Sequence, residues 1–279
     1  MSDTSNAEPE ADSSYLSPPV QRAARLLRRI GDGDAVTNMA RTARELEINR
    51  TTLLRLLHTL EAERLIEPRG ADIPGWRIGR GLIAMAAHAF YSDDMVQAAM
   101  PVLSRLAETL GLSTHLGQLD GLEVVYLLRR TPNVSFASNI RVGSRLPAHA
   151  STMGRIILAH LPPEQVTRMY AQTKLQAVTA HTAVTLPQLR ALLDKDREAG
   201  LAWSDEFFEA GISSVAAAVL DSSGAPVAAL NITGQVASFA EETKRAQIGR
   251  AATEAAEEIS RHLGWNGQKP RHTNLQVVA

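Results

Sequence analysis

Residues 49–62 are predicted to form a capped helix with leucines along one face. Few folds are compatible with this helix and the segments that flank it. Leu53, Leu56, Leu57 and Leu60 recur at the i, i+3, i+4 and i+7 spacing of one helix face. Asn49 precedes them, and its side-chain oxygen can accept a free amide proton of the first turn. The side chains outside the leucine face gather near the N-terminal end: Arg50, Thr51, Thr52 and Arg55. A recognition helix meets DNA with this end, whereas the alternative is an amphipathic surface helix with solvated arginines.

The neighbouring segments favour DNA binding. Residues 41–46 form a short predicted helix, and residues 47–49 are a tight link, so the two helices make a helix-turn-helix. Two short predicted strands, 64–67 and 76–78, flank the turn-rich residues 68–75, which is the pattern of a wing. We therefore predict a winged helix-turn-helix that binds double-stranded DNA. The predicted DNA contacts are Asn49, Arg50, Thr51, Thr52, Arg55 and, on the wing, Arg69.

The charge of the chain agrees with a modest DNA-binding module. The formal net charge is -1, so a DNA-binding surface must come from local charge. Between Val20 and Gly70 there are ten arginines and seven acidic residues. This small excess fits a module that needs two copies on DNA to reach specific affinity.

Composition excludes several other classes. The chain has no cysteine, so it has no disulfide, thiolate zinc site or cysteine nucleophile. Its scattered histidines lack metal-ligand spacing, and we expect neither a metal nor a cofactor. No apolar run reaches the length that crosses a bilayer, and the acidic start does not resemble a signal peptide. We expect a cytoplasmic protein without a membrane partner.

The chain divides into five predicted parts. Residues 1–17 read as a disordered tail, residues 18–79 as the DNA-binding domain, and residues 266–279 as a flexible tail. Residues 80–92 form an Ala-rich apolar helix with little polar surface. We expect this helix to link the domains and to pack against a second copy, giving a homodimer.

Residues 93–265 show an α+β pattern. Helices are predicted over the ranges 95–110, 151–160, 163–170, 186–199 and 240–263. Strands are predicted over 113–119, 123–130, 134–140, 201–204, 213–220 and 227–233. Asp120-Gly121 joins the first two strands and is a strong hairpin signal. An antiparallel sheet flanked by helices is the layout of a small-molecule sensing domain.

In this order of parts, residues 18–265 resemble the IclR-type transcriptional regulators. The N-terminal likeness rests on Asn49-Arg50-Thr51-Thr52 and on Trp76-Arg77-Ile78-Gly79. The C-terminal likeness rests on the motifs within residues 142–159, 200–206, 211–217 and 229–234. The resemblance implies a winged helix, a linker helix and a GAF-like effector domain. It also implies a dimer, or a dimer of dimers, on palindromic operators.

The resemblance further implies where a small carboxylate effector binds. Carried onto this chain, the family's pocket residues are Met153, Gly154, Ser204, Ser214, Asn231 and Thr233. Asn231 and Thr233 are two apart on a predicted strand and therefore face the same side, among apolar neighbours. A ligand carboxylate could satisfy such a pair, although bonds to neighbouring loops are the alternative. Residues 151–152 begin a helix whose free amides attract anions.

One departure bears on the ligand. The family's glyoxylate and pyruvate responder carries Asp and Cys at the positions of Ser204 and Ser214. This difference favours an effector other than glyoxylate or pyruvate. Residues 142–147 and 151–155 are more similar to the protocatechuate and hydroxybenzoate regulators, the branch of the family that governs aromatic-acid catabolism. A short aliphatic acid remains the alternative.

Two other functions were weighed for the second domain. An enzyme would need Ser151 with His149 as its base, or His115 with the acids at 205 and 206, and neither spacing matches a nucleophile motif. We therefore expect no catalytic residue. The other alternative is a DNA-binding protein whose second domain serves only as a dimerisation scaffold.

Overall fold

A computed structural model of the protein describes residues 15–132, 140–205 and 211–267. The chain divides between Ser92 and Asp93 into two compact units, which we call the first and the second unit. Each unit has its own hydrophobic core.

Three helices build most of the first unit: α1 (Pro18–Gly31), α2 (Met39–Glu45) and α3 (Arg50–Ala62). Helices α2 and α3 were predicted from the sequence, and α2 begins two residues earlier than expected. Asn38 caps α2, because its Oδ1 accepts the Arg41 amide at 3.0 Å. In the turn before α3, Glu47 adopts a left-handed φ of 54°, which reverses the chain within a few residues.

A two-stranded antiparallel hairpin follows α3. Strand β1 (Ile66–Pro68) pairs with β2 (Trp76–Ile78), with Ile66 opposite Ile78. The predicted wing is thus confirmed, although its first strand begins two residues later than expected. The apolar faces of the helices and of β1 meet in one core, which contains Leu26, Ile30, Leu53, Leu57, Leu60 and Ile66.

Helix α4 (Arg80–Tyr91) completes the first unit. A β-carbon at Gly79 or Gly81 would lie 2.4 or 2.7 Å from the carbonyl oxygen of Arg64, so only glycine lets α4 start this close to the hairpin. No residue of α4 is buried, and the side chains of Ile83 and Met85 are largely exposed. Most of the apolar surface of α4 is therefore exposed in the described structure.

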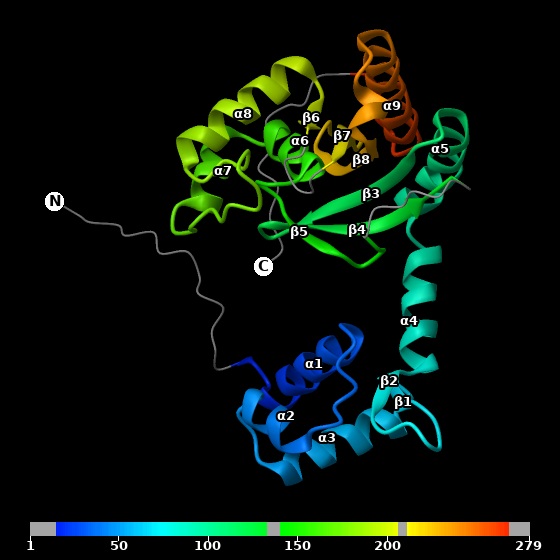
Figure 1. Cartoon of the computed structure of the whole chain (residues 1–279), viewed down its shortest axis with the longest axis vertical. Coiled ribbons are helices and arrows are strands. Elements are labelled where there is room, and N and C mark those ends of the chain that lie inside the picture. The colour runs from blue at the N-terminus through cyan, green and yellow to red at the C-terminus, as the bar shows by residue number, and fades with distance from the viewer. Residues whose placement is uncertain (1–14, 133–139, 206–210, 268–279) are drawn as a thin grey trace, which may run out of the picture. The chain divides into compact units, whose positions relative to one another are not determined.

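The second unit is built on a six-stranded antiparallel sheet with the order β5-β4-β3-β8-β7-β6 (Figure 1). The strands are β3 (Ser113–Asp120), β4 (Glu123–Arg130), β5 (Arg145–Pro147), β6 (Ala202–Asp205), β7 (Ile212–Leu220) and β8 (Pro226–Gln235). Strands β3 and β8, distant in sequence, are the central neighbours. The α+β class predicted from the sequence is confirmed.

Helices cover both faces of the sheet (Figure 1). They are α5 (Asp94–Leu110), α6 (Thr152–His160), α7 (Pro163–Tyr170), α8 (Leu186–Ala199) and α9 (Glu242–His262), with a 3-10 turn η2 (Val236–Phe239). Helix α6 packs on the face that carries Val124, Ala216 and Ala229. On the opposite face, Thr114 bonds to the α5 backbone and Trp203 packs against Gly249 of α9.

Two details of the strand prediction need comment. The strand expected over 134–140 lies outside the described residues except for Ile140. The edge strand β5 was not predicted, because it has only three residues and includes Pro147, a pattern that periodicity does not detect. None of the helices in the described chain has the length and apolar character that crossing a bilayer demands.

Candidate functional site

The N-terminal end of α3 presents polar side chains to solvent. Asn49 Oδ1 accepts the Thr52 amide at 2.7 Å, so its side chain caps the helix as predicted. Arg50, Thr51 and Arg55 are exposed and Thr52 is half-buried. The leucines at 53, 57 and 60 point into the core, which fixes the polar face outward.

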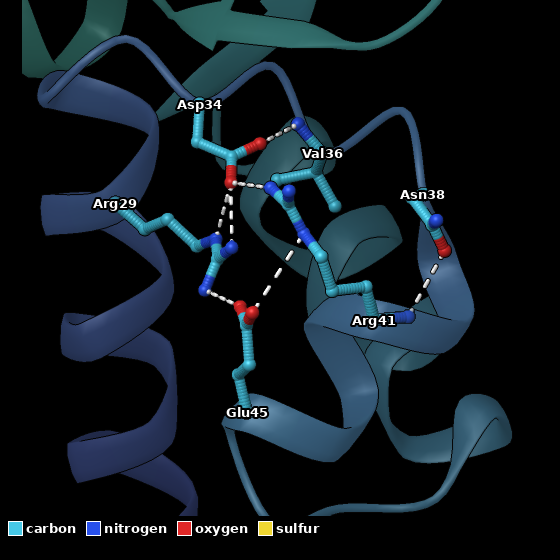
Figure 2. A network of polar contacts seen from close by, with 6 residues as sticks. All are labelled: Arg29, Asp34, Val36, Asn38, Arg41 and Glu45. Carbon is cyan, nitrogen blue, oxygen red and sulfur yellow. Dashed lines mark hydrogen bonds and ion pairs between the residues drawn. The ribbon is translucent and has the colours of Figure 1, made fainter.

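An ion-pair network holds α1 against α2 (Figure 2). Asp34 lies 2.6 Å from Nη2 of Arg29 and 2.9 Å from Nη2 of Arg41, and Glu45 contacts both arginines. The Val36 amide donates to Asp34 at 2.8 Å, and this bond, followed by the Arg29 contact, lowers the pKa of Asp34. Arg29 and Arg41 thus have carboxylate partners within the unit, and the Arg41 side chain is 56% exposed.

The wing carries a further arginine. Arg69 is exposed, and its amide donates to the Gly75 carbonyl at 3.1 Å across the hairpin. Arg77 is instead paired with Glu67 at 2.7 Å. Within the described residues, Arg50, Arg55 and Arg69 form no ion pair, so three predicted DNA contacts keep their full charge available.

A small polar pocket of about 40 Å³ lies between α6 and the sheet in the second unit. It is lined by Tyr126, Ile140, Leu146, Ala150, Ser151, Thr152, Ser204, Ile212, Ser214, Asn231 and Thr233. Four of the six residues predicted to bind the effector therefore share one cavity: Ser204, Ser214, Asn231 and Thr233. A cavity of this size holds water but must open to admit an aromatic acid.

Strand register brings these side chains together. Ser214 of β7 is paired with Ser204 on one side and with Thr233 on the other, so the three lie in one row across the sheet. Asn231 lies in the next row on the same face, opposite His115 of β3. Helix α6 covers both rows with its first turn, where Ser151 Oγ accepts the Gly154 amide at 3.1 Å.

A chain of hydrogen bonds connects three buried polar residues with the half-buried Ser214. His115 Nδ1 lies 3.2 Å from Asn231 Oδ1. Asn231 Nδ2 donates to Thr152 Oγ1 at 2.9 Å, and Thr152 Oγ1 lies 3.2 Å from Ser214 Oγ. Thr233 Oγ1 separately donates to the Ser213 carbonyl at 3.2 Å. Among the described residues, Asn231 and Thr233 thus bond to neighbouring strands and to α6.

Tyr126 and Arg129 are among the residues of this region that sequence reasoning missed. An irregularity in the β3–β4 pairing sets Arg129 opposite His115 and Tyr126 opposite Gly117, which places both on the pocket face. Burial raises the pKa of Tyr126, so its phenol stays protonated. Arg129 donates to the carbonyl of Ile140, a pocket residue, at 2.5 Å, and brings positive charge close to the site.

Two predicted effector residues, Met153 and Gly154, are not among the lining residues. The Met153 side chain is fully buried in the core, and a β-carbon on Gly117 would lie 2.9 Å from its Cε. Gly154 packs against the Ala148 backbone, where a β-carbon would lie 2.2 Å from the carbonyl oxygen. Both residues pack against the core beside the pocket, on the side of α6 that faces away from the cavity, and their contact with an effector stays a prediction.

Three of the residues considered for catalysis have hydrogen-bond or ion-pair partners outside the proposed catalytic pairs. His149 Nε2 lies 3.0 Å from the Gln176 carbonyl, and Ser151 caps α6. Asp205 is paired with Arg245 at 3.0 Å, which lowers the pKa of Asp205, and residue 206 lies outside the described residues. The part of the chain that the structure describes contains no cluster of three potential metal-binding side chains.

A larger groove of about 330 Å³ runs between α5 and α9. It is open to solvent, and an exposed ion pair between Arg105 and Glu258 lines it. Because the polar pocket under α6 is lined by buried groups that converge, it is the better ligand site despite its smaller volume.

Comparison with known proteins shows the family to which both units belong. Residues 87–261 match the family model "Bacterial transcriptional regulator IclR C-terminal", and residues 19–70 match the IclR helix-turn-helix domain. The chain belongs to the IclR family. It is thus a DNA-binding transcriptional regulator of the IclR type, as the sequence predicted.

Individual IclR relatives match over nearly the full chain. The HTH-type transcriptional repressor AllR of Klebsiella pneumoniae is 27% identical over 249 residues, covering 89% of this chain and 91% of the relative. An IclR regulator from Alicyclobacillus acidocaldarius superposes with a TM-score of 0.80 at 25% identity, covering 90% of this chain and 100% of that one. An IclR homolog from Microbacterium hydrocarbonoxydans, solved in complex with 4-hydroxybenzoate, superposes with a TM-score of 0.75 at 26% identity, covering 88% and 98%.

Proposed function

We propose that this IclR-family regulator senses a small carboxylic acid in the polar pocket of its second unit and thereby controls a catabolic operon. The observation that carries the proposal is the two rows of polar residues under the first turn of α6, in which Ser204, Thr233 and Asn231 are buried and Ser214 is half-buried. Buried polar groups that converge on a cavity are typical of a binding site. The free amides at the start of α6 and the nearby charge of Arg129 favour an anion.

We infer that the acid is aromatic, with a short aliphatic acid such as glyoxylate or pyruvate as the alternative. Support comes from the serines at 204 and 214 and from the apolar pocket residues Ile140, Leu146 and Ile212, which can pack against a ring. A structural relative was solved with 4-hydroxybenzoate, whereas the AllR relatives are named as repressors without a ligand. The second unit acts in this proposal by binding and not by turnover.

We infer that the regulator works as a homodimer, or as a dimer of dimers, on palindromic operators in the cytoplasm. The unpartnered apolar surface of α4, with Ile83 and Met85 exposed, supports pairing with a second copy. Because the pocket holds little more than water in this form, a larger acid must select a more open arrangement. The acid shifts operator binding to the extent that it prefers that arrangement.

Calorimetry on the full chain tests the sensing role. The panel contains 4-hydroxybenzoate, protocatechuate, glyoxylate and pyruvate, and the variants are Ser214→Ala and, as a matched control, Ser213→Ala. Ser213 is the neighbouring buried serine on the opposite face, where it bonds to Asp205. One acid is expected to bind the wild type and the control, and to bind Ser214→Ala at least ten times more weakly. No binding by any acid would instead favour a dimerisation scaffold.

Selection of duplexes from a random pool tests the DNA-binding residues. Arg50→Ala and Arg55→Ala are expected to weaken binding to the selected duplex, and each lost phosphate contact lowers the salt slope by about 1. Arg261→Ala, which removes an exposed ion pair with Glu257 in the second unit, is the control. Equal affinity of all three variants would contradict the assignment of α3 as the recognition helix.

A further inference from the structure

A fully buried histidine lies at the inner end of the pocket's hydrogen-bond chain. The His115 side chain is 0% exposed, and its ring packs edge-on against Tyr126 with centroids 5.4 Å apart. Nδ1 faces Asn231 Oδ1, whereas Nε2 has no hydrogen-bond partner among the described residues. Burial, with a smaller contribution from the Arg129 charge, lowers the pKa of His115 to about 4. The ring is therefore neutral at pH 7 and carries a single N–H.

The surroundings of the ring decide which nitrogen carries that proton. Asn231 Oδ1 offers only lone pairs, so a hydrogen bond at 3.2 Å requires the proton on Nδ1. The reverse tautomer would place an N–H at Nε2, where a buried donor would have no acceptor in the described structure. Unpaired buried N–H groups are rarer in proteins than under-satisfied acceptors, so the Nδ1–H form is favoured.

The protonation of His115 then sets the direction of the remaining bonds. With Oδ1 held by His115, the Asn231 amide turns its Nδ2 toward Thr152 Oγ1. Thr152 Oγ1 accepts that bond, which leaves the Thr152 proton for Ser214 Oγ at 3.2 Å. The Ser214 proton is then free to be donated into the cavity. All four residues donate in the same sense, from the core toward the ligand.

We propose that His115 is a positioning residue that fixes the direction of this chain, so that Ser214 presents a proton and the pocket takes a hydrogen-bond acceptor, a carboxylate oxygen, at that point. The inference rests on the proposed function, since it specifies how the acid is held. The inference can be tested separately from the proposed function, because the protonation of His115 can be measured without any ligand. Were Asn231 reversed, Thr152 and Ser214 would both donate inward and the wall would present lone pairs that repel a carboxylate.

The first experiment records the ring nitrogens of the full chain, labelled with nitrogen-15 in histidine, by NMR at pH 7. The His115 signals are those that disappear in His115→Asn. We expect a protonated Nδ1 and a bare Nε2. A protonated Nε2, or a doubly protonated ring, overturns the inference regardless of whether any acid binds.

The second experiment compares His115→Asn with His115→Leu, two residues of similar size that both lose the contact with Tyr126. Asparagine restores an N–H toward Asn231, and leucine does not. For the acid of the calorimetric panel that the wild type binds, we expect a loss within about threefold in His115→Asn and of at least tenfold in His115→Leu. A packing role predicts the opposite order, because leucine suits an apolar core better.

The outcomes separate this inference from the proposed function. If no acid of the panel binds the wild type, the sensing proposal fails, and the nitrogen spectra still decide the direction of the chain. If the acid binds His115→Asn and His115→Leu equally, sensing stands and the role of His115 is overturned. His149→Phe is the control, because His149 is another nearly buried histidine that packs edge-on against a tyrosine but bonds to the Gln176 carbonyl.

Discussion

Arg155 of α6 and Asp196 of α8 are joined by two parallel hydrogen bonds of 2.9 Å, with side chains only 3% and 8% exposed. Nη2 of Arg155 also donates to the Trp203 carbonyl at 2.9 Å. Thr152 lies one turn before Arg155, and Ser204 follows Trp203. This buried pair therefore positions two sides of the polar pocket.

Asp196→Ala is expected to lower the free energy of unfolding by about 3–5 kcal/mol, because it leaves the Arg155 charge buried without its counterion. Denaturant unfolding measures the effect. Asp194→Ala removes the exposed pair with Arg197 and should cost about 0.5 kcal/mol or less. Burial raises the pKa of Asp196 despite Arg155, so the pair itself contributes little. Arg155→Met combined with Asp196→Leu should thus recover most of the loss, and a double variant as unstable as Asp196→Ala would contradict this account.

The free energy of unfolding should decrease as the pH falls, because His115 binds a proton more readily in the unfolded chain. Its pKa is about 4 in the folded protein and about 6.5 in the unfolded chain, so between these values the unfolded state binds the extra proton. Lowering the pH from 7 to 4 therefore favours unfolding, by roughly 3 kcal/mol for this shift. Denaturant unfolding of the wild type and of His115→Leu at several pH values isolates the contribution. Parallel pH profiles would show that His115 does not titrate differently in the two states.

Gly154 is expected to tolerate no side chain. A β-carbon would lie 2.2 Å from the Ala148 carbonyl oxygen, and neither backbone can move without displacing α6 from the sheet. Gly154→Ala should cost about 3 kcal/mol in thermal or denaturant unfolding. At Gly31, the nearest atom to a β-carbon is 3.9 Å away, so Gly31→Ala should leave stability unchanged. Similar midpoints for the two variants would refute the packing argument.

Asn49 allows helix capping to be separated from DNA contact. Asn49→Ala removes the acceptor for the Thr52 amide and should cost about 1 kcal/mol of stability. Asn49→Asp keeps a capping oxygen and favours the helix dipole, so it should fold as well as the wild type. Its negative charge would nevertheless face phosphates, and its affinity for the selected duplex should fall at least tenfold. Wild-type affinity in Asn49→Asp would place this end of α3 away from DNA.

Much of the fold follows from local patterns in the sequence. The leucine spacing, the cap at Asn49 and the turn-rich tip predicted α3 and the wing, because each depends on residues close in the chain. Alternation also placed Asn231 and Thr233 on one face of β8. These features need no knowledge of distant partners.

The rest of the pocket depends on contacts that spacing does not encode. His115 meets Asn231 only because β3 and β8 are neighbours in the sheet. Tyr126 and Arg129 share a face only because the β3–β4 pairing is irregular, which breaks the alternation that a regular strand would show. Met153 and Gly154 were assigned to the ligand by resemblance, and the packing of α6 turns them into the core.

The pocket walls come from β4, β5, β6, β7, β8 and α6, so the lining spans the chain from Tyr126 to Thr233. No part of this cavity exists before the second unit has folded. A metabolite that occupies the cavity therefore binds only the folded state, and the melting temperature rises as the concentration of the metabolite increases. If the proposed sensing role holds, the concentration of the effector would also set how long each regulator molecule survives proteolysis.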